Sequence, residues 1–277
     1  MPFATGDAQI YYESLGDTSQ PTVVLIEGAG AQMLGWHQDF CQLLLDTGFH
    51  VARMDNRDVG LSRKFGGPEH IDGGYGIEDM ASDVIAVLDH LGMERAHLVG
   101  RSMGAIIAQV VALEHPARVA SQTWISSIPS QEPAYILQDA TESLTAAPVR
   151  LTRAQAIAFA VAMATPSPGE TYPPDIEWAK QAAAEAYDRC YAPEGMHRQW
   201  AALMRAPDRL ERLRQVAIPT ALIHGRNDPV LHWQASADTA AAVPDAELHV
   251  YSGMGHGLPR ALWPDVIATI RRTASKA

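Results

Sequence analysis

Short apolar runs alternate with amphipathic stretches through the first half of the chain. Runs such as Thr22 to Ile26 contain no polar gap, which favours strands buried on both faces of a sheet. Stretches such as Ile77 to Leu91 place their apolar residues at helical spacing. This alternation predicts an α/β fold, a mostly parallel central sheet with helices on both faces. We expect strands at residues 9–13 (an edge strand), 22–26, 50–54, 96–100 and 119–126, and helices at residues 38–47, 77–91 and 105–114.

Residues 127–207 interrupt the alternation. They are rich in alanine, proline and polar residues and indicate helices without a strand. Strands are expected again at residues 219–225 and 246–251, followed by a closing helix at residues 264–273. A helical insertion of this kind is typical of a lid over the carboxyl ends of the strands, where open α/β sheets bind ligands. We predict a core domain formed by residues 1–126 and 208–277, with an inserted helical cap formed by residues 127–207.

A serine lies at the junction between an expected strand and the next helix. The stretch LVGRSMG, residues 98–104, contains the pattern G-x-S-x-G. This pattern is typical of a strained turn that projects Ser102 into a cleft, because Gly100 and Gly104 leave room where strand and helix meet. The N–H of Met103 then points from a helix N-terminus into the same cleft, where it favours negative charge.

A serine nucleophile needs a base, and the base needs an orienting acid. After the insertion, Asp228 follows the first expected strand and His256 follows the second. The order Ser102, Asp228, His256 is the order that G-x-S-x-G predicts for a catalytic triad. Asp238 and Asp245 are competing acids, but each lies in or after a helix rather than directly after a strand.

An oxyanion hole needs a second N–H donor, on the loop after an early strand. The residues Glu27-Gly28-Ala29-Gly30 follow the strand at residues 22–26. We predict that the N–H of Ala29 is the second donor. His224 is expected to be a strand-end histidine.

Composition and charge restrict the partners. The 277 residues are 47% hydrophobic, and the formal net charge is −11. An acidic surface repels phosphate backbones and anionic lipid, so we expect no nucleic acid and no membrane as partners. We expect a small-molecule substrate and a monomer or homodimer.

The cysteines and histidines form no pattern of metal ligands. Cys41 and Cys190 are far apart in sequence, and we expect both to be free thiols of a cytoplasmic protein. No HExxH spacing occurs among the 11 histidines, so we expect no metal. The expected chemistry needs no cofactor. The amino-terminal residues contain no basic region followed by an apolar segment, so no secretory signal is expected.

The motifs LVGRSMG, HGRNDPV and SGMGH, in this order, resemble those of capped α/β-hydrolase-fold proteins. The stretches GAQMLGWHQDF, MDNRDVGLS and MGHGLP are most similar to the aclacinomycin methylesterase group, which hydrolyses a carboxylic methyl ester on a polyketide-derived molecule. The resemblance runs over about residues 8–273 and implies esterase chemistry. One departure from the family pattern is Glu27, where many members have histidine. We expect Glu27 to pair with Arg53 or Arg57, because an unpaired carboxylate near the oxyanion would oppose the developing charge.

The underside of a lid over an active site is apolar, so some aromatic residues and methionines are expected to contact the substrate. The candidate pocket residues are Trp36, Met163, Trp178, Tyr187, Tyr191 and Trp200.

The sequence therefore predicts a serine hydrolase that cleaves a carboxylic ester of apolar character. The same triad also serves C–C bond hydrolysis and cofactor-free perhydrolysis. A binding protein of this fold that has lost turnover is a third alternative. Substrate panels separate the first two alternatives from ester hydrolysis, and tight binding without turnover identifies the third.

Overall fold

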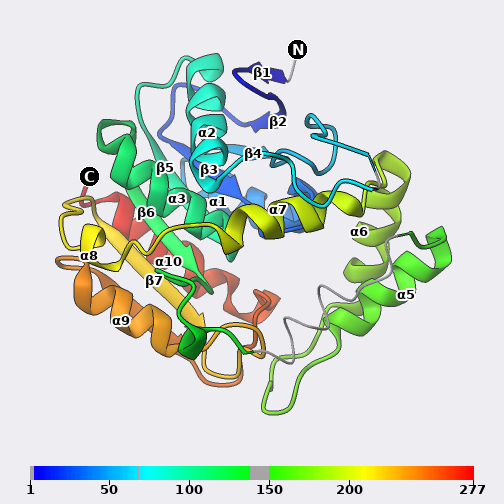
Figure 1. Ribbon diagram of the computed structural model, residues 1–277. Coiled ribbons are helices and arrows are strands. Elements are labelled where there is room, and N and C mark those ends of the chain that lie inside the picture. Colours follow the sequence, from blue (N-terminus) through cyan, green and yellow to red (C-terminus); the bar gives the residue numbers. More distant parts are fainter. Residues whose placement is uncertain (1–2, 68, 138–149) are drawn as a thin grey trace.

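The protein is described by a computed structural model that covers residues 3–67, 69–137 and 150–277. Its described strands form one sheet in the order β1-β2-β4-β3-β5-β6-β7-β8 (Figure 1). The strands are β1 (Phe3–Thr5), β2 (Gln9–Leu15), β3 (Thr22–Ile26), β4 (His50–Met54), β5 (Ala96–Arg101), β6 (Val119–Ile125), β7 (Thr220–Gly225) and β8 (Glu247–Tyr251). β2 is antiparallel to both of its neighbours, and every pair from β4 to β8 is parallel. The predicted mostly parallel α/β fold is confirmed.

The expectation that residues 9–13 form the edge strand is wrong. β1 pairs with β2 on its outer side and is itself the edge. With three residues, β1 is too short to show a strand pattern in the sequence.

Helices cover both faces of the sheet, as the sequence predicts. Two of them pack on one face: α1 (Gln38–Asp46) and α10 (Trp263–Ala274). The other face is covered by α2 (Ile77–Leu91), α3 (Met103–Glu114), α8 (Leu210–Leu213) and α9 (Gln234–Ala242). The described 3₁₀ turns are Met33–Gly35, Pro116–Arg118, Pro133–Tyr135 and Arg260–Leu262.

β3 shows why the apolar runs have no gaps. Val23 and Leu25 belong to the hydrophobic cluster under α1 and α10, whereas Val24 and Ile26 belong to the cluster under α2 and α3. All five residues of the strand are buried, because each face of the pleat meets a layer of helices.

Between β6 and β7, the described residues include α5 (Arg153–Ala164), α6 (Ile176–Arg189) and α7 (Glu194–Met204), which precede the short helix α8. α5 packs against α6 beside the layered core, and α7 runs back across it (Figure 1). These helices fall in the range 127–207 that the sequence predicts as a cap. The cap boundaries stay a prediction, and residues 138–149 lie outside the described residues.

Buried polar contacts fix α6 and α7 to loops of the core. The side chains of Arg198 and Asp58 are both completely buried and form an ion pair of 2.8 Å. Arg189 pairs with the buried Asp55 at 2.7 Å. Because breaking a buried pair leaves an uncompensated charge, these contacts fix the position of α6 and α7 on the core.

Both cysteines are free, as predicted. Cys41 is buried in the core, and this burial raises the pKa of its thiol to about 11. Among the described residues, no helix is both long and apolar enough to cross a lipid bilayer.

Candidate active site

Ser102 forms the sharp turn between β5 and α3. Its backbone has φ 52° and ψ −119°, in the left-handed region that non-glycine residues rarely adopt. The Ser102 N–H donates to the carbonyl of Ile125 on β6 at 2.8 Å. A Cβ at Gly100 would overlap the backbone of Gly104, and a Cβ at Gly104 would overlap the carbonyl of Ile26. The start of α3 is therefore pressed against β3 and β5, and only glycine fits at the two flanking positions of G-x-S-x-G.

The other two predicted triad residues are hydrogen-bonded to each other. His256 Nδ1 lies 2.7 Å from Asp228 Oδ2. The Asp228 side chain is completely buried, while 26% of the His256 side chain is exposed. β5, β7 and β8 belong to the parallel part of the sheet, and each of the three residues follows the carboxyl end of one of these strands. Ser102, Asp228 and His256 therefore lie along the same edge of the sheet.

The contacts of Asp228 keep it ionised. Its Oδ1 accepts the N–H groups of Val230 at 2.8 Å and Leu231 at 2.9 Å. Burial alone would raise the pKa of Asp228. The charge of His256 and the hydrogen bonds from His224 and His256 outweigh this effect and hold the pKa well below its usual range. This geometry fixes the position of the carboxylate against His256.

His224 is a contact that sequence reasoning missed. Its Nε2 lies 3.2 Å from Asp228 Oδ2, and both side chains are completely buried. Ser236 Oγ lies 2.7 Å from the other ring nitrogen, Nδ1. The only sequence feature that points to this contact is the spacing, a histidine four residues before the predicted acid. The two side chains meet because the chain turns tightly after β7.

The competing acid Asp238 is occupied elsewhere. Its Oδ2 accepts the hydroxyl of Tyr135 at 2.8 Å, and its Oδ1 accepts Gln234 Nε2 at 3.0 Å. Among the described contacts, none joins Asp238 to His256.

The predicted oxyanion donors are N–H groups that have no acceptor among the described residues. Gly28 N–H donates to Glu27 Oε2 at 2.8 Å, and Gly30 N–H donates to Gln199 Oε1 at 2.7 Å. The Ala29 N–H between them has no such partner. Met103 is the first residue of α3, so its N–H has no acceptor within the helix. The neighbouring contacts hold the Ala29 peptide in place while leaving its donor free.

The expected partner of Glu27 is wrong. Glu27 Oε2 pairs with Arg101 Nη2 at 2.9 Å, whereas Arg53 pairs with Glu13 and Arg57 with Asp83. The sheet register explains the difference. Ile26 is level with Gly100, so Glu27 emerges beside Arg101, while Arg53 lies opposite Leu25, two residues before Glu27.

Two neighbouring cavities share several lining residues, among them Arg101, which directly precedes Ser102. The larger, here called the cap cavity, has a volume of about 580 Å³ and lies between the loop at residues 29–35 and the helices α5, α6 and α7. It is lined mainly by alanines and other apolar side chains. Four of the expected pocket residues line it: Met163, Trp178, Tyr187 and Tyr191.

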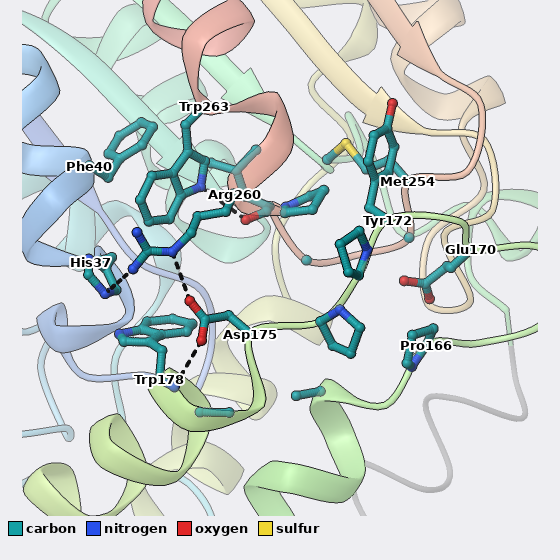
Figure 2. Close-up of a pocket in the computed structure, with 18 of the residues that line it drawn as sticks. His37, Phe40, Pro166, Glu170, Tyr172, Asp175, Trp178, Met254, Arg260 and Trp263 are labelled. Carbon is teal, nitrogen blue, oxygen red and sulfur yellow. Dashed lines mark hydrogen bonds and ion pairs between the residues drawn. The ribbon is translucent and has the colours of Figure 1, made fainter.

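The smaller cavity, here called the histidine cavity, has a volume of about 210 Å³ and is lined by Gly255 and Gly257 on either side of His256. Trp36, the fifth expected pocket residue, lines it and packs on Phe40 with ring centroids 5.5 Å apart. Figure 2 shows Arg260 at its rim, between His37 and Asp175. Arg101 lines both cavities.

Trp200, the sixth expected pocket residue, is not among the residues that line either cavity. It packs against the hydrophobic core from α7. The neighbouring residues Arg198 and Gln199 are buried against core loops, so this part of α7 faces the core rather than the cavities.

Within the described part of the chain, no group of three or more histidine, cysteine, aspartate or glutamate residues is arranged to hold a metal ion.

The fold and the site geometry define a hydrolase of the α/β-hydrolase class. The family profile described as alpha/beta hydrolase fold matches residues 21–259, and the chain belongs to this family. The resemblance inferred from the sequence motifs is confirmed.

Individual relatives carry different activities in their names. A protein provisionally named carbamate hydrolase RutD, from Variovorax paradoxus, is 30% identical over 89% of each chain. Rhodomycin D methylesterase DnrP from Streptomyces peucetius is 34% identical, over 42% of this chain and 38% of its own length. A structure from a study of carboxylesterases of Nitrososphaera gargenis has a TM-score of 0.79 at 22% identity and covers 100% of both chains. At this identity, the last likeness shows the fold alone.

Proposed function

We propose that the protein is a serine hydrolase that cleaves a carboxylic ester. Ser102 Oγ attacks the carbonyl carbon while His256 Nε2 accepts the hydroxyl proton. The C–O bond to the alcohol breaks, His256 returns the proton to the departing alcohol, and the acyl group remains on Ser102. Water gives a proton to His256 and attacks the acyl carbon; the bond to Ser102 Oγ then breaks, His256 returns the proton to Ser102, and the acid leaves.

The observation that carries the proposal is the hydrogen bond of 2.7 Å between His256 Nδ1 and the buried Asp228, on the sheet edge where Ser102 forms a strained turn. A carboxylate on Nδ1 fixes the imidazole tautomer, which leaves Nε2 free to accept a proton, and it stabilises the imidazolium that follows. The free N–H groups of Ala29 and Met103 supply the oxyanion hole, each contributing about 3 kcal/mol to lowering the barrier.

The decisive test is labelling with a fluorophosphonate, which reacts only with an activated serine. We expect one adduct per chain, located on Ser102 by peptide mapping. His256→Ala should remove the adduct, because the serine loses its base. Folded wild-type protein that stays unlabelled would overturn the proposal and favour a binding protein without turnover.

The cavities support a particular orientation of the ester. His256 protonates the leaving oxygen, so the alcohol must extend toward the histidine cavity that Gly255 and Gly257 border. The acyl group then extends into the cap cavity, which Ala29 lines. The volumes of about 210 and 580 Å³ favour a bulky apolar acyl group and a small alcohol such as methanol.

Two isomeric esters test this orientation: methyl 4-phenylbutanoate and 3-phenylpropyl acetate. We expect kcat/KM to be at least about tenfold higher for the methyl ester. Ala160→Leu should fill part of the cap cavity and lower kcat/KM for the methyl ester several-fold, whereas Ala158→Leu, at an exposed position on the same helix, should not. Equal or reversed preference in the wild type would overturn the orientation.

Carbamate hydrolysis is the second candidate, supported by the 30% identity to the RutD relative over 89% of each chain. A carbamate carbonyl would be attacked by the same serine. Turnover of a methyl carbamate but not of a methyl ester with the same apolar group would favour this candidate.

A further inference from the structure

Glu27 and Arg101 form an ion pair that joins the loop of Ala29 to the sharp turn at Ser102. Glu27 directly follows β3, Arg101 is the last residue of β5, and Nη2 of Arg101 lies 2.9 Å from Glu27 Oε2. The Glu27 side chain is completely buried, whereas 23% of the Arg101 side chain is exposed. Arg101 therefore directly precedes the proposed nucleophile Ser102, and Glu27 lies two residues before Ala29, a proposed oxyanion donor.

The Glu27 carboxylate has a structural task in the oxyanion loop. Its Oε2 accepts the Gly28 N–H at 2.8 Å, which orients the peptide next to Ala29. Its Oε1 is buried without a hydrogen-bond partner among the described atoms, and a Cβ at Gly35 would overlap this carboxylate. Glu27 is therefore enclosed by protein, with Arg101 as its one ion-pair partner among the described residues.

The same carboxylate brings negative charge to the loop that carries the proposed oxyanion donor Ala29. Gly28 packs against the turn at Ser102, since a Cβ at Gly28 would lie 3.3 Å from Ser102 Cβ. A buried carboxylate on the residue before Gly28, if uncompensated, disfavours negative charge on the tetrahedral intermediate. The guanidinium of Arg101 is positioned to cancel that charge while leaving the bond to Gly28 intact.

We infer that Arg101 is a positioning residue that compensates the charge of Glu27, so that Glu27 orders the oxyanion loop without opposing the oxyanion. The inference rests on the proposed function. Arg101 also lines both cavities, so direct contact with the substrate is the competing role. The two roles predict different kinetics: charge compensation acts on the transition state and changes kcat, whereas substrate contact changes KM.

The test is a double-mutant cycle with Arg101→Met and Glu27→Gln, using methyl 4-phenylbutanoate. Arg101→Met should lower kcat about 100-fold and change KM less than about threefold, because it leaves a buried carboxylate uncompensated. Glu27→Gln alone should lower kcat far less than Arg101→Met, because the amide oxygen still accepts the Gly28 N–H and no uncompensated carboxylate remains. The double variant should recover to within about fivefold of Glu27→Gln, which is strong coupling between the two sites.

A second arm keeps the test valid if Arg101→Met does not fold. The double variant contains no buried charge at this position, so we expect it to fold and to retain activity in either case. Arg101→Lys, which keeps the positive charge, should lose less than about tenfold in kcat. Two results would overturn the inference: a folded double variant whose kcat is as low as that of Arg101→Met, or an Arg101→Met variant whose KM rather than kcat changes. In both cases, turnover by the wild type would still support the proposed function. Wild-type protein without turnover or fluorophosphonate adduct would overturn the proposed function itself.

Discussion

Ser102→Ala is expected to lose at least about 10³-fold in kcat/KM while keeping the fold. Triad residues act as a unit, so removing the nucleophile removes nearly all of the contribution of His256 and Asp228 as well. The fold should survive because alanine, like serine, carries a Cβ. The free-energy cost of a positive φ, 52° at this position, is therefore similar for both residues. Ester turnover and thermal unfolding, measured on the same preparation, check both parts of the prediction.

Ser126 offers a matched control. It also directly follows a strand of the sheet and has φ 50°, but it is completely buried, and its hydroxyl has no hydrogen-bond partner among the described atoms. Ser126→Ala should stay within about threefold of wild-type kcat/KM. Full activity in Ser102→Ala would refute the proposed mechanism, and equal losses in both variants would indicate a structural effect rather than loss of a nucleophile.

The parts of the site that were predictable are those that local sequence determines. A strong apolar run ending in a polar or glycine residue indicates the carboxyl end of a buried strand, as it does for β5 before Ser102 and β7 before Asp228. His256 follows the edge strand β8, which is only partly buried and is recognised from its place after the preceding helix. The G-x-S-x-G spacing also determines the turn, because a Cβ at Gly100 or Gly104 would meet backbone. Neither inference needs the order of strands in the sheet.

The contacts that were missed depend on how strands and helices come together. The partner of Glu27 follows from the order β4-β3-β5 and from a register that brings Arg101, not Arg53, beside it. The position of Trp200 depends on which face of α7 turns toward the core. The residue pattern along one strand or helix does not show which neighbour it packs against. Both neighbours of β3 carry an arginine, Arg53 on β4 and Arg101 on β5, and the sequence pattern does not distinguish them.

Asp228→Asn is expected to lower kcat about 10³- to 10⁴-fold and also to lower stability at neutral pH, because the depressed pKa of Asp228 means that folding favours its ionised form. The asparagine amide keeps the shape of the side chain, and its oxygen can still accept the Val230 and Leu231 N–H groups. Its NH₂ group would then face His256 Nδ1 and donate to it, which moves the ring proton to Nε2. The imidazole could no longer accept the Ser102 proton there. Steady-state kinetics with the methyl ester, together with thermal unfolding, measure the two effects separately.

Asp238→Asn is the control for this prediction, because Asp238 is the competing acid and its carboxylate accepts Tyr135 and Gln234 instead of His256. It should keep kcat within about threefold of the wild type. A large loss in Asp238→Asn with a small loss in Asp228→Asn would reverse the assignment of the acid. A large loss only in Asp228→Asn would link the buried carboxylate to the proton transfer. Both substitutions remove one negative charge from the chain, but only Asp228→Asn removes the acceptor of His256.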